Sequence, residues 1–253
     1  MNGLTVFARK EAQEILRTWR RWVLPGILLF FALTGPVLAK YTPQILEAFA
    51  GSQLGGLTIP TPTYLDAYAQ WIKNLAQIAT FALIIIYGGI VSAELRSGTA
   101  VLVLTKPVSR SAFVVVKAAV NAAFVTVLVL VATLVTWAVT TILFGSAPGA
   151  ALWSSSLVWL VFAVLLVALM TLLSVMIGSA AGAAGAGLGF YVLISIASIW
   201  KPLASYSPAG LVTQATALAA GEPATPWWPV AGSLVLSVVF VVIAARLFRR
   251  KEL

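Results

Sequence analysis

The chain has 253 residues, of which 61% are hydrophobic and only 9% are charged, whereas an average soluble domain is about 45–50% apolar and about 25% charged. A water-soluble fold of this size cannot bury so much apolar surface, because most residues of a small domain touch solvent. The composition therefore predicts an integral membrane protein and excludes a soluble enzyme, a disordered tail and a disulfide scaffold.

Residues 1–21 are predicted to form an amphipathic helix. Apolar side chains such as Phe7 and Ile15 recur at helical spacing, and the acidic residues precede the basic ones, which suits the helix dipole. We interpret the segment as an interfacial elbow helix in the cytoplasmic headgroups that turns into the membrane at Pro25-Gly26, and a plain membrane anchor is the alternative. The elbow residues of interest are Arg17, Trp19, Arg20 and Arg21.

Six stretches are long and apolar enough to cross a bilayer core of about 30 Å, which needs about 20 helical residues. They are residues 22–39, 76–93, 112–144, 155–178, 183–200 and 228–247. The third carries Lys117 and Asn121 near its start, so we expect it to begin in the cytoplasm and to enter the bilayer after them. The fold class expected is an all-α integral membrane protein, with six transmembrane helices and the elbow helix in a single domain, 1–253.

The positions of the cations predict the topology. Lys and Arg are retained on the cytoplasmic side of membrane proteins. Here they lie in the N-terminal segment, between the second and third stretches and in the C-terminal tail, with only Lys40, Lys73 and Lys201 elsewhere. We therefore expect a multi-pass protein of the plasma or inner cell membrane with both termini in the cytoplasm. The net charge of +9 then reports topology, and no nucleic-acid partner is expected.

The segments on the opposite side are expected to be mostly loop. Tyr64, Tyr68 and Trp71 suit an aromatic belt at the outer membrane interface. The external loop 201–227 contains a weakly amphipathic stretch, 211–220, which is either a short helix dipping into the outer membrane face or a surface loop. Between the fourth and fifth stretches, Gly, Ala and Ser alternate over 178–189, which predicts a tight hairpin with close helix packing.

The loop 94–111 between the second and third stretches is the most informative part of the sequence. It is expected to be cytoplasmic, yet it contains the apolar run 101–104, which is too short to span the membrane and needs a partner surface. Ser109 or Ser111 can cap the third stretch. Glu94 is either an interfacial charge paired with Arg96 or Arg110, or a latch between the second stretch and a cytoplasmic partner.

The sequence carries no evident catalytic or metal site. It contains neither Cys nor His, which removes cysteine nucleophiles, histidine acid–base chemistry and most zinc sites. No acidic residue lies in the middle of an apolar stretch, whereas proton-driven carriers rely on intramembrane carboxylates or histidines. If this chain moves a solute uphill, the energy must come from another subunit.

These features resemble the permease subunits of type II ATP-binding-cassette (ABC) exporters. The resemblance covers nearly the whole chain, and its most specific part is the Glu-x-x-Ser-Gly-Thr…Lys-Pro-Val-Ser-Arg spacing of the loop. The Tyr206-Ser207-Pro208 stretch after the fifth span is also similar. The loop residues that match the family's ATPase-coupling element are Glu94, Ser97, Gly98, Thr99, Val101, Leu102, Leu104, Lys106, Pro107, Ser109 and Arg110.

The resemblance implies partners and a pathway. Two permease chains would pair side by side in the bilayer, and each would rest on one of two copies of a soluble ABC ATPase subunit, which binds ATP and Mg. No cofactor is then expected in this chain. Phe81, Tyr87 and Tyr191 would be pathway residues, since the second and fifth spans line the central pathway in relatives.

Two other readings stay open. A membrane scaffold or assembly factor would use the same loop to hold a partner without moving cargo. A channel or secondary carrier is disfavoured by the lack of intramembrane charges. The sequence does not select a cargo, and it does not distinguish a homodimer from two related permeases.

Overall fold

The computed structural model describes residues 3–50, 60–99 and 109–251, and every regular element in these ranges is a helix. Six helical stretches are long and apolar enough to cross a membrane: Arg20–Ala48, Tyr64–Arg96, Arg110–Phe144, Ala150–Ile177, Ala180–Ala197 and Trp227–Arg249. This confirms the all-α membrane fold predicted from composition, with an additional helix before the first stretch.

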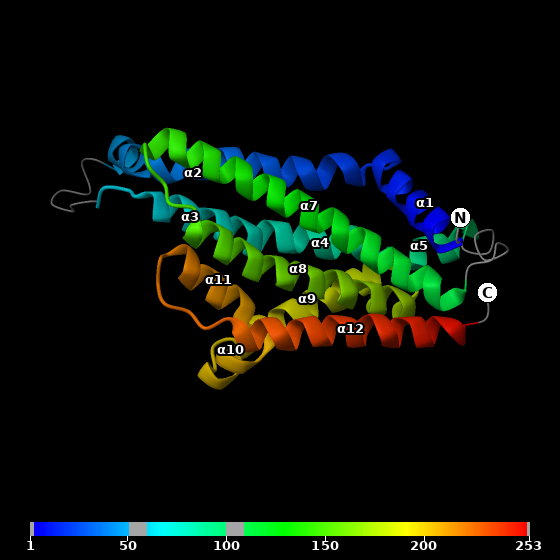
Figure 1. Cartoon of the computed structure of the whole chain (residues 1–253). Helices are drawn as coiled ribbons and strands as arrows, with labels where there is room; N and C mark the ends of the chain where they lie inside the picture. The colour runs from blue at the N-terminus through cyan, green and yellow to red at the C-terminus, as the bar shows by residue number, and fades with distance from the viewer. Residues whose placement is uncertain (1–2, 51–59, 100–108, 252–253) are drawn as a thin grey trace.

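The helices form an elongated bundle with two distinct ends (Figure 1). The chain begins with α1 (Gly3–Arg17) and α2 (Arg20–Ala50), then α3 (Tyr64–Asn74), a π-helical turn at Leu75–Ala79, α4 (Thr80–Tyr87), α5 (Ser92–Arg96) and α7 (Arg110–Phe144). It continues through α8 (Ala150–Ile177), α9 (Ala180–Ala197), α10 (Lys201–Tyr206), a 3-10 turn at Pro208–Gly210, α11 (Leu211–Ala219) and α12 (Trp227–Arg249).

We name the two ends by what they hold. The terminal end holds α1, α5, the start of α7 and the end of α12, and thus both ends of the chain (Figure 1). The far end holds the last turns of α2, the start of α3, α10 and α11. Which end faces the cytoplasm remains a prediction from the cations.

Helix α8 forms the centre of the core. Its side chains are buried along most of its length, including the large Trp159 and Phe162. Helices α4, α7, α9, α11 and α12 all pack against it. Because α8 is apolar on every side, it can be enclosed in this way by neighbouring helices, whereas α9 and α12 leave broad apolar faces exposed, as lipid-facing helices do.

The elbow bends earlier than predicted. The chain breaks between α1 and α2 at Thr18-Trp19, and Pro25 lies inside α2, so the prediction of a turn at Pro25-Gly26 is wrong. The break is stabilised by side chains that satisfy the last carbonyls of α1. Thr18 donates to the Ile15 carbonyl (3.2 Å) and Arg21 donates to the Leu16 carbonyl (2.8 Å).

The second span is interrupted near the terminal end. Between α4 and α5 the chain leaves the α-helical pattern over 88–91, which frees backbone N–H groups. Ser174 of α8 accepts from two of them, Val91 (3.1 Å) and Ser92 (3.0 Å). A Cβ at Gly88 would lie 2.5 Å from the Ala180 carbonyl oxygen at the start of α9, so the interruption needs glycine for this close approach.

Two of the three residues predicted to form an aromatic belt at the membrane interface, Tyr68 and Trp71, do not lie on the protein surface. Tyr68 and Trp71 are fully buried inside the protein, while Tyr64 is half-buried. Tyr68 donates to the Ala147 carbonyl (3.3 Å), and Trp71 donates to Ser156 (3.2 Å). Their polar groups have protein acceptors, so neither side chain needs the headgroup region that an interfacial aromatic residue uses.

The structure shows that the stretch 211–220 is helical and that the connection between α8 and α9 is short, as predicted. The stretch expected to be either helix or loop at 211–220 is helix α11, which packs against α8 and α3. Gly178, with φ of 72°, ends α8, and Ser179 caps α9 by accepting from the Gly182 N–H (3.2 Å). The connection is thus as tight as predicted, and the glycines from Gly182 onward lie within α9 rather than in the turn.

Candidate functional site

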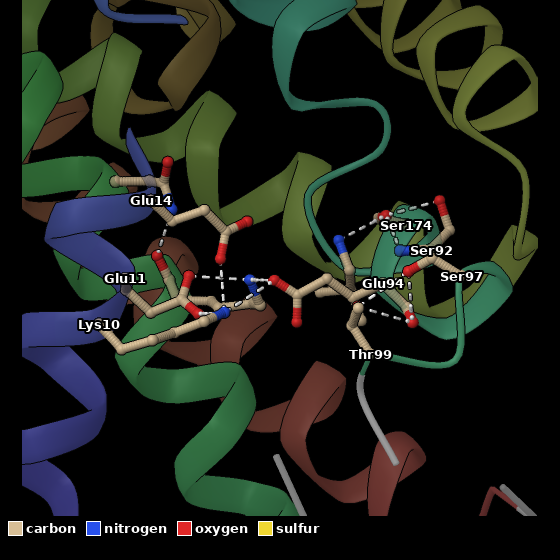
Figure 2. A network of polar contacts seen from close by, with 11 residues as sticks. Lys10, Glu11, Glu14, Ser92, Glu94, Ser97, Thr99 and Ser174 are labelled. Carbon is tan, nitrogen blue, oxygen red and sulfur yellow. Dashed lines mark hydrogen bonds and ion pairs between the residues drawn. The ribbon is translucent and has the colours of Figure 1, made fainter. Parts of the chain in front are cut away.

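Five charged side chains from three helices meet at the terminal end (Figure 2). We call them the charged cluster: Lys10, Glu11 and Glu14 of α1, Glu94 of α5, and Lys117 of α7. Lys117 Nζ lies 2.8 Å from Glu11 Oε2 and 2.5 Å from Glu94 Oε1. Lys10 Nζ lies 2.9 Å from Glu11 Oε1 and 3.3 Å from Glu94 Oε1, and it also contacts Glu14.

The centre of the cluster is shielded from solvent. The side chains of Lys117 and Glu11 are each only 3% exposed, and that of Glu94 is 10% exposed. A buried ion pair gains little net stability because desolvation opposes the Coulomb attraction, but removing one partner leaves an uncompensated charge and is strongly destabilising. The cluster therefore holds α1, α5 and α7 in one relative arrangement.

The sequence of α1 explains how the cluster is assembled. Phe7, Glu11 and Ile15 are buried and lie four residues apart, so they share the helix face that packs against α7. Phe7 stacks on Phe113 of α7 at 5.4 Å between ring centroids, and Phe113 stacks on Phe248 of α12 at 5.3 Å. Lys117 follows Phe113 by one helical turn, which places its ammonium beside Glu11.

Contacts within the charged cluster shift the pKa values of Lys10 and Glu14, its two more exposed members. Burial alone would lower the pKa of Lys10, but hydrogen bonds to Glu14 and Glu11 and the negative charges around it raise it above its usual value. Burial alone would raise the pKa of Glu14, but the hydrogen bond from Lys10 and the charge of Lys117 outweigh this and lower it. Both groups are therefore charged at neutral pH.

The carboxylates of the cluster already have cationic partners. Carboxylate oxygens of Glu11, Glu14 and Glu94 lie within 4.8 Å of one another, close enough for a cation. The ammonium groups of Lys10 and Lys117 already donate to these carboxylates and supply the positive charge. Within the described residues, Glu94 Oε2 is buried without a hydrogen-bond partner.

The partners predicted for Glu94 were wrong. Glu94 pairs with Lys117 and Lys10, whereas Arg96 is exposed and Arg110 donates to the Lys251 carbonyl (2.7 Å) at the end of α12. Burial is the physical reason, because Glu94 points into the bundle. Lys117, expected near the cytoplasmic start of its span, is likewise enclosed by α1.

The two described borders of the loop 94–111 are both held at the terminal end. Ser97 and Thr99 donate to the Glu94 carbonyl at 3.3 and 3.4 Å, and Gly98 between them has a φ of 72°. On the other side Ser109 caps α7, as predicted, by accepting from the Ala112 N–H (3.2 Å). The remaining predicted coupling residues lie outside the described residues: Val101, Leu102, Leu104, Lys106 and Pro107.

The elbow and pathway residues lie elsewhere. Around the α1–α2 break, Arg20 is half-buried and the other elbow residues are exposed: Arg17, Trp19 and Arg21. The predicted pathway residues differ in their exposure. Phe81 is exposed and meets Tyr191 edge to face at 5.6 Å, whereas Tyr87 is buried in the core and lines no open surface of this chain.

Sequence reasoning missed the partners of Glu94. The acidic residues of α1 were interpreted only as suiting the helix dipole, although Glu11 lies on the buried face of this helix. One signal was available: Lys117 stands in a long apolar stretch, where an ionisable side chain needs a partner. Its partners, however, are 23 and 106 residues away in the chain.

Comparison with known proteins identifies a family. No curated protein matches the chain. One family profile matches residues 52–253, which include α3 to α12 and two members of the charged cluster, Glu94 and Lys117. The chain therefore belongs to the family described as Protein of unknown function (DUF2705).

Proposed function

We propose that this chain is the membrane-spanning permease subunit of an ATP-driven ABC exporter. The observation that carries the proposal is the charged cluster beside the loop 94–111. It joins the helix that precedes the loop, the helix that follows it and the N-terminal helix α1 through buried ion pairs. A loop that receives force from a partner needs such a rigid attachment to the spans.

The proposed complex contains two permease chains and two soluble ATPase subunits, which bind ATP and Mg. Its chains lie in the plasma or inner membrane with both termini in the cytoplasm. This orientation would put the terminal end, with its loop, on the same side as the ATPase. The apolar run 101–104 in the sequence would supply the contact surface.

Coupling would be mechanical. ATP binding closes the ATPase pair and displaces the loop. Because α1, α5 and α7 share buried ion pairs, the displacement moves them as one body, and closely packed helices respond by shifting between discrete arrangements. A membrane scaffold, which is the alternative, would need the contact surface but no transmitted movement.

Gly98 provides a sharp test with a matched control. Gly98 and Gly145 both have positive φ (72° and 77°), and no heavy atom lies within 4 Å of a Cβ built on either. Gly98→Val and Gly145→Val therefore impose similar backbone strain, the first within the loop 94–111 and the second at the far end after α7. The chain is purified from native membranes with its partner, and ATP hydrolysis by the complex is measured.

We expect a co-purified ATPase whose activity depends on the permease. Gly98→Val should reduce that dependence at least several-fold, while Gly145→Val leaves it near the wild-type level. Replacing Leu102 and Leu104 by Asp should release the partner. A purification without any ATPase would contradict the proposal, and a bound ATPase indifferent to all these changes would favour the scaffold.

A further inference from the structure

A cavity of about 680 Å3 lies at the far end of the bundle, opposite the charged cluster. Its walls come from the last turns of α2, from residues 60–62, from one face of α3 and its π-helical continuation, from Tyr191 of α9 and from α11. Cavities of roughly 300–1,000 Å3 with mostly apolar walls and a few polar groups are typical ligand sites.

One helix face supplies the charged side chains and the two amides of the lining. Asp66, Gln70, Lys73 and Gln77 follow one another three or four residues apart along α3 and the π-helical turn, so they point to the same side. Asp66, Lys73 and Gln77 are exposed, so a ligand can reach the cavity from the surface.

The two charged side chains of the lining, Asp66 and Lys73, differ in whether they already have a polar partner. Asp66 Oδ2 already accepts from the Thr63 N–H (2.7 Å) and hydroxyl (2.9 Å), which caps the start of α3. The ion pairs of the described residues all belong to the charged cluster, so Lys73 has no carboxylate partner among them. Lys73 also lies within the candidate membrane span Tyr64–Arg96, where an ammonium group favours an anion or water beside it.

Part of the cavity lining has irregular helix geometry. Leu75–Ala79 is a π-helical turn, and the Tyr191 hydroxyl donates to its Ala76 carbonyl at 2.9 Å. Single π-helical turns inside α-helices occur frequently at functional sites. Ala69, Ala76 and Val212 contribute apolar side chains to the lining.

We infer that this cavity binds an amphiphile with an anionic headgroup, which the Lys73 ammonium and the Gln77 amide contact while the acyl chain lies along Ala69, Ala76 and Val212. The walls match both parts of such a molecule, since the Lys73 ammonium, which has no carboxylate partner among the described residues, shares the cavity with the apolar side chains of Ala69, Ala76 and Val212. The inference goes beyond the proposed function, because it concerns binding and is tested without an ATPase.

The test uses the purified full chain in detergent and counts bound lipid by native mass spectrometry. The probes are dioctanoyl phosphatidylglycerol, dioctanoyl phosphatidylcholine, decanoate and decanol. We expect the phosphatidylglycerol to bind about tenfold more tightly than the phosphatidylcholine, as expected for a charge-assisted hydrogen bond. Decanoate compared with decanol shows whether a carboxylate can take the place of the lipid phosphate.

Three variants test separately how the contact with the headgroup and the space in the cavity contribute to binding. Lys73→Gln should abolish the preference for the anionic lipid, while Lys201→Gln, an exposed cation on α10 outside the cavity, should retain it. Ala69→Trp, which fills the cavity, should weaken binding of both lipids. Equal binding of the two lipids by the unmodified chain, or a preference that survives Lys73→Gln, would overturn the inference. Size-exclusion profiles establish that each variant is folded.

Discussion

At the scale of single residues, Lys117 determines how the terminal end is organised. It is the residue of the charged cluster that connects α7 to both α1 and α5, since it contacts Glu11 and Glu94. A lysine in a long apolar stretch signals a partner, and this much could be predicted from sequence. The partner's identity depends on which face of α1 packs against α7, a tertiary contact that local periodicity does not encode.

Lys117→Met should destabilise the chain by about 3 kcal/mol, the lower part of the range for breaking a buried ion pair. The reason is that Glu11 and Glu94 lose their shared ammonium, although Lys10 still contacts both. The measurement is the free energy of unfolding by denaturant in mixed micelles. Lys201→Met, which changes an exposed cation, is the control and should cost little. A loss below about 1 kcal/mol for Lys117→Met would show that the cluster is not tightly coupled.

At the scale of helices, the apolar pattern of the sequence predicts the second span but not the interruption within it. Composition predicted an apolar stretch at 76–93, and the helix found there begins at Tyr64, contains a π-helical turn and is interrupted over 88–91. The apolar pattern identifies a span because length and hydropathy are local properties. The interruption depends instead on Ser174 and the start of α9, which lie more than 80 residues away. The interruption changes the direction of α5 relative to α4, and Glu94 of α5 contacts Lys117.

Ser174→Ala should cost about 2 kcal/mol, because it leaves the Val91 and Ser92 N–H groups buried without an acceptor. Thr171→Val is the matched control one turn earlier on α8. That hydroxyl is equally buried but donates only to the Val167 carbonyl of its own helix, so its loss should cost less than about 1 kcal/mol. Comparable losses in the two variants, measured by thermal unfolding in one detergent, would show that Ser174 does not support the interruption.

At the scale of the whole molecule, the chain is polarised between its two ends. The terminal end carries the charged cluster, both chain ends and most of the cations, whereas the far end carries the cavity and buried aromatic residues such as Tyr68. Counting spans and cations was sufficient to expect both termini on one side, because an even number of crossings returns the chain to its starting face. The far-end cavity escaped prediction because four separate segments build it.

The absence of cysteine from the sequence makes this polarity directly testable. Gln13→Cys places a thiol on an exposed position of α1, and Glu222→Cys places one at an exposed position after α11. If the cations are retained in the cytoplasm, a membrane-impermeant maleimide should label Glu222→Cys in intact cells and Gln13→Cys only after permeabilisation. The unmodified chain gives the background. The reverse pattern would invert the topology and move the loop 94–111 away from any cytoplasmic ATPase, so this labelling experiment also bears on the proposed function.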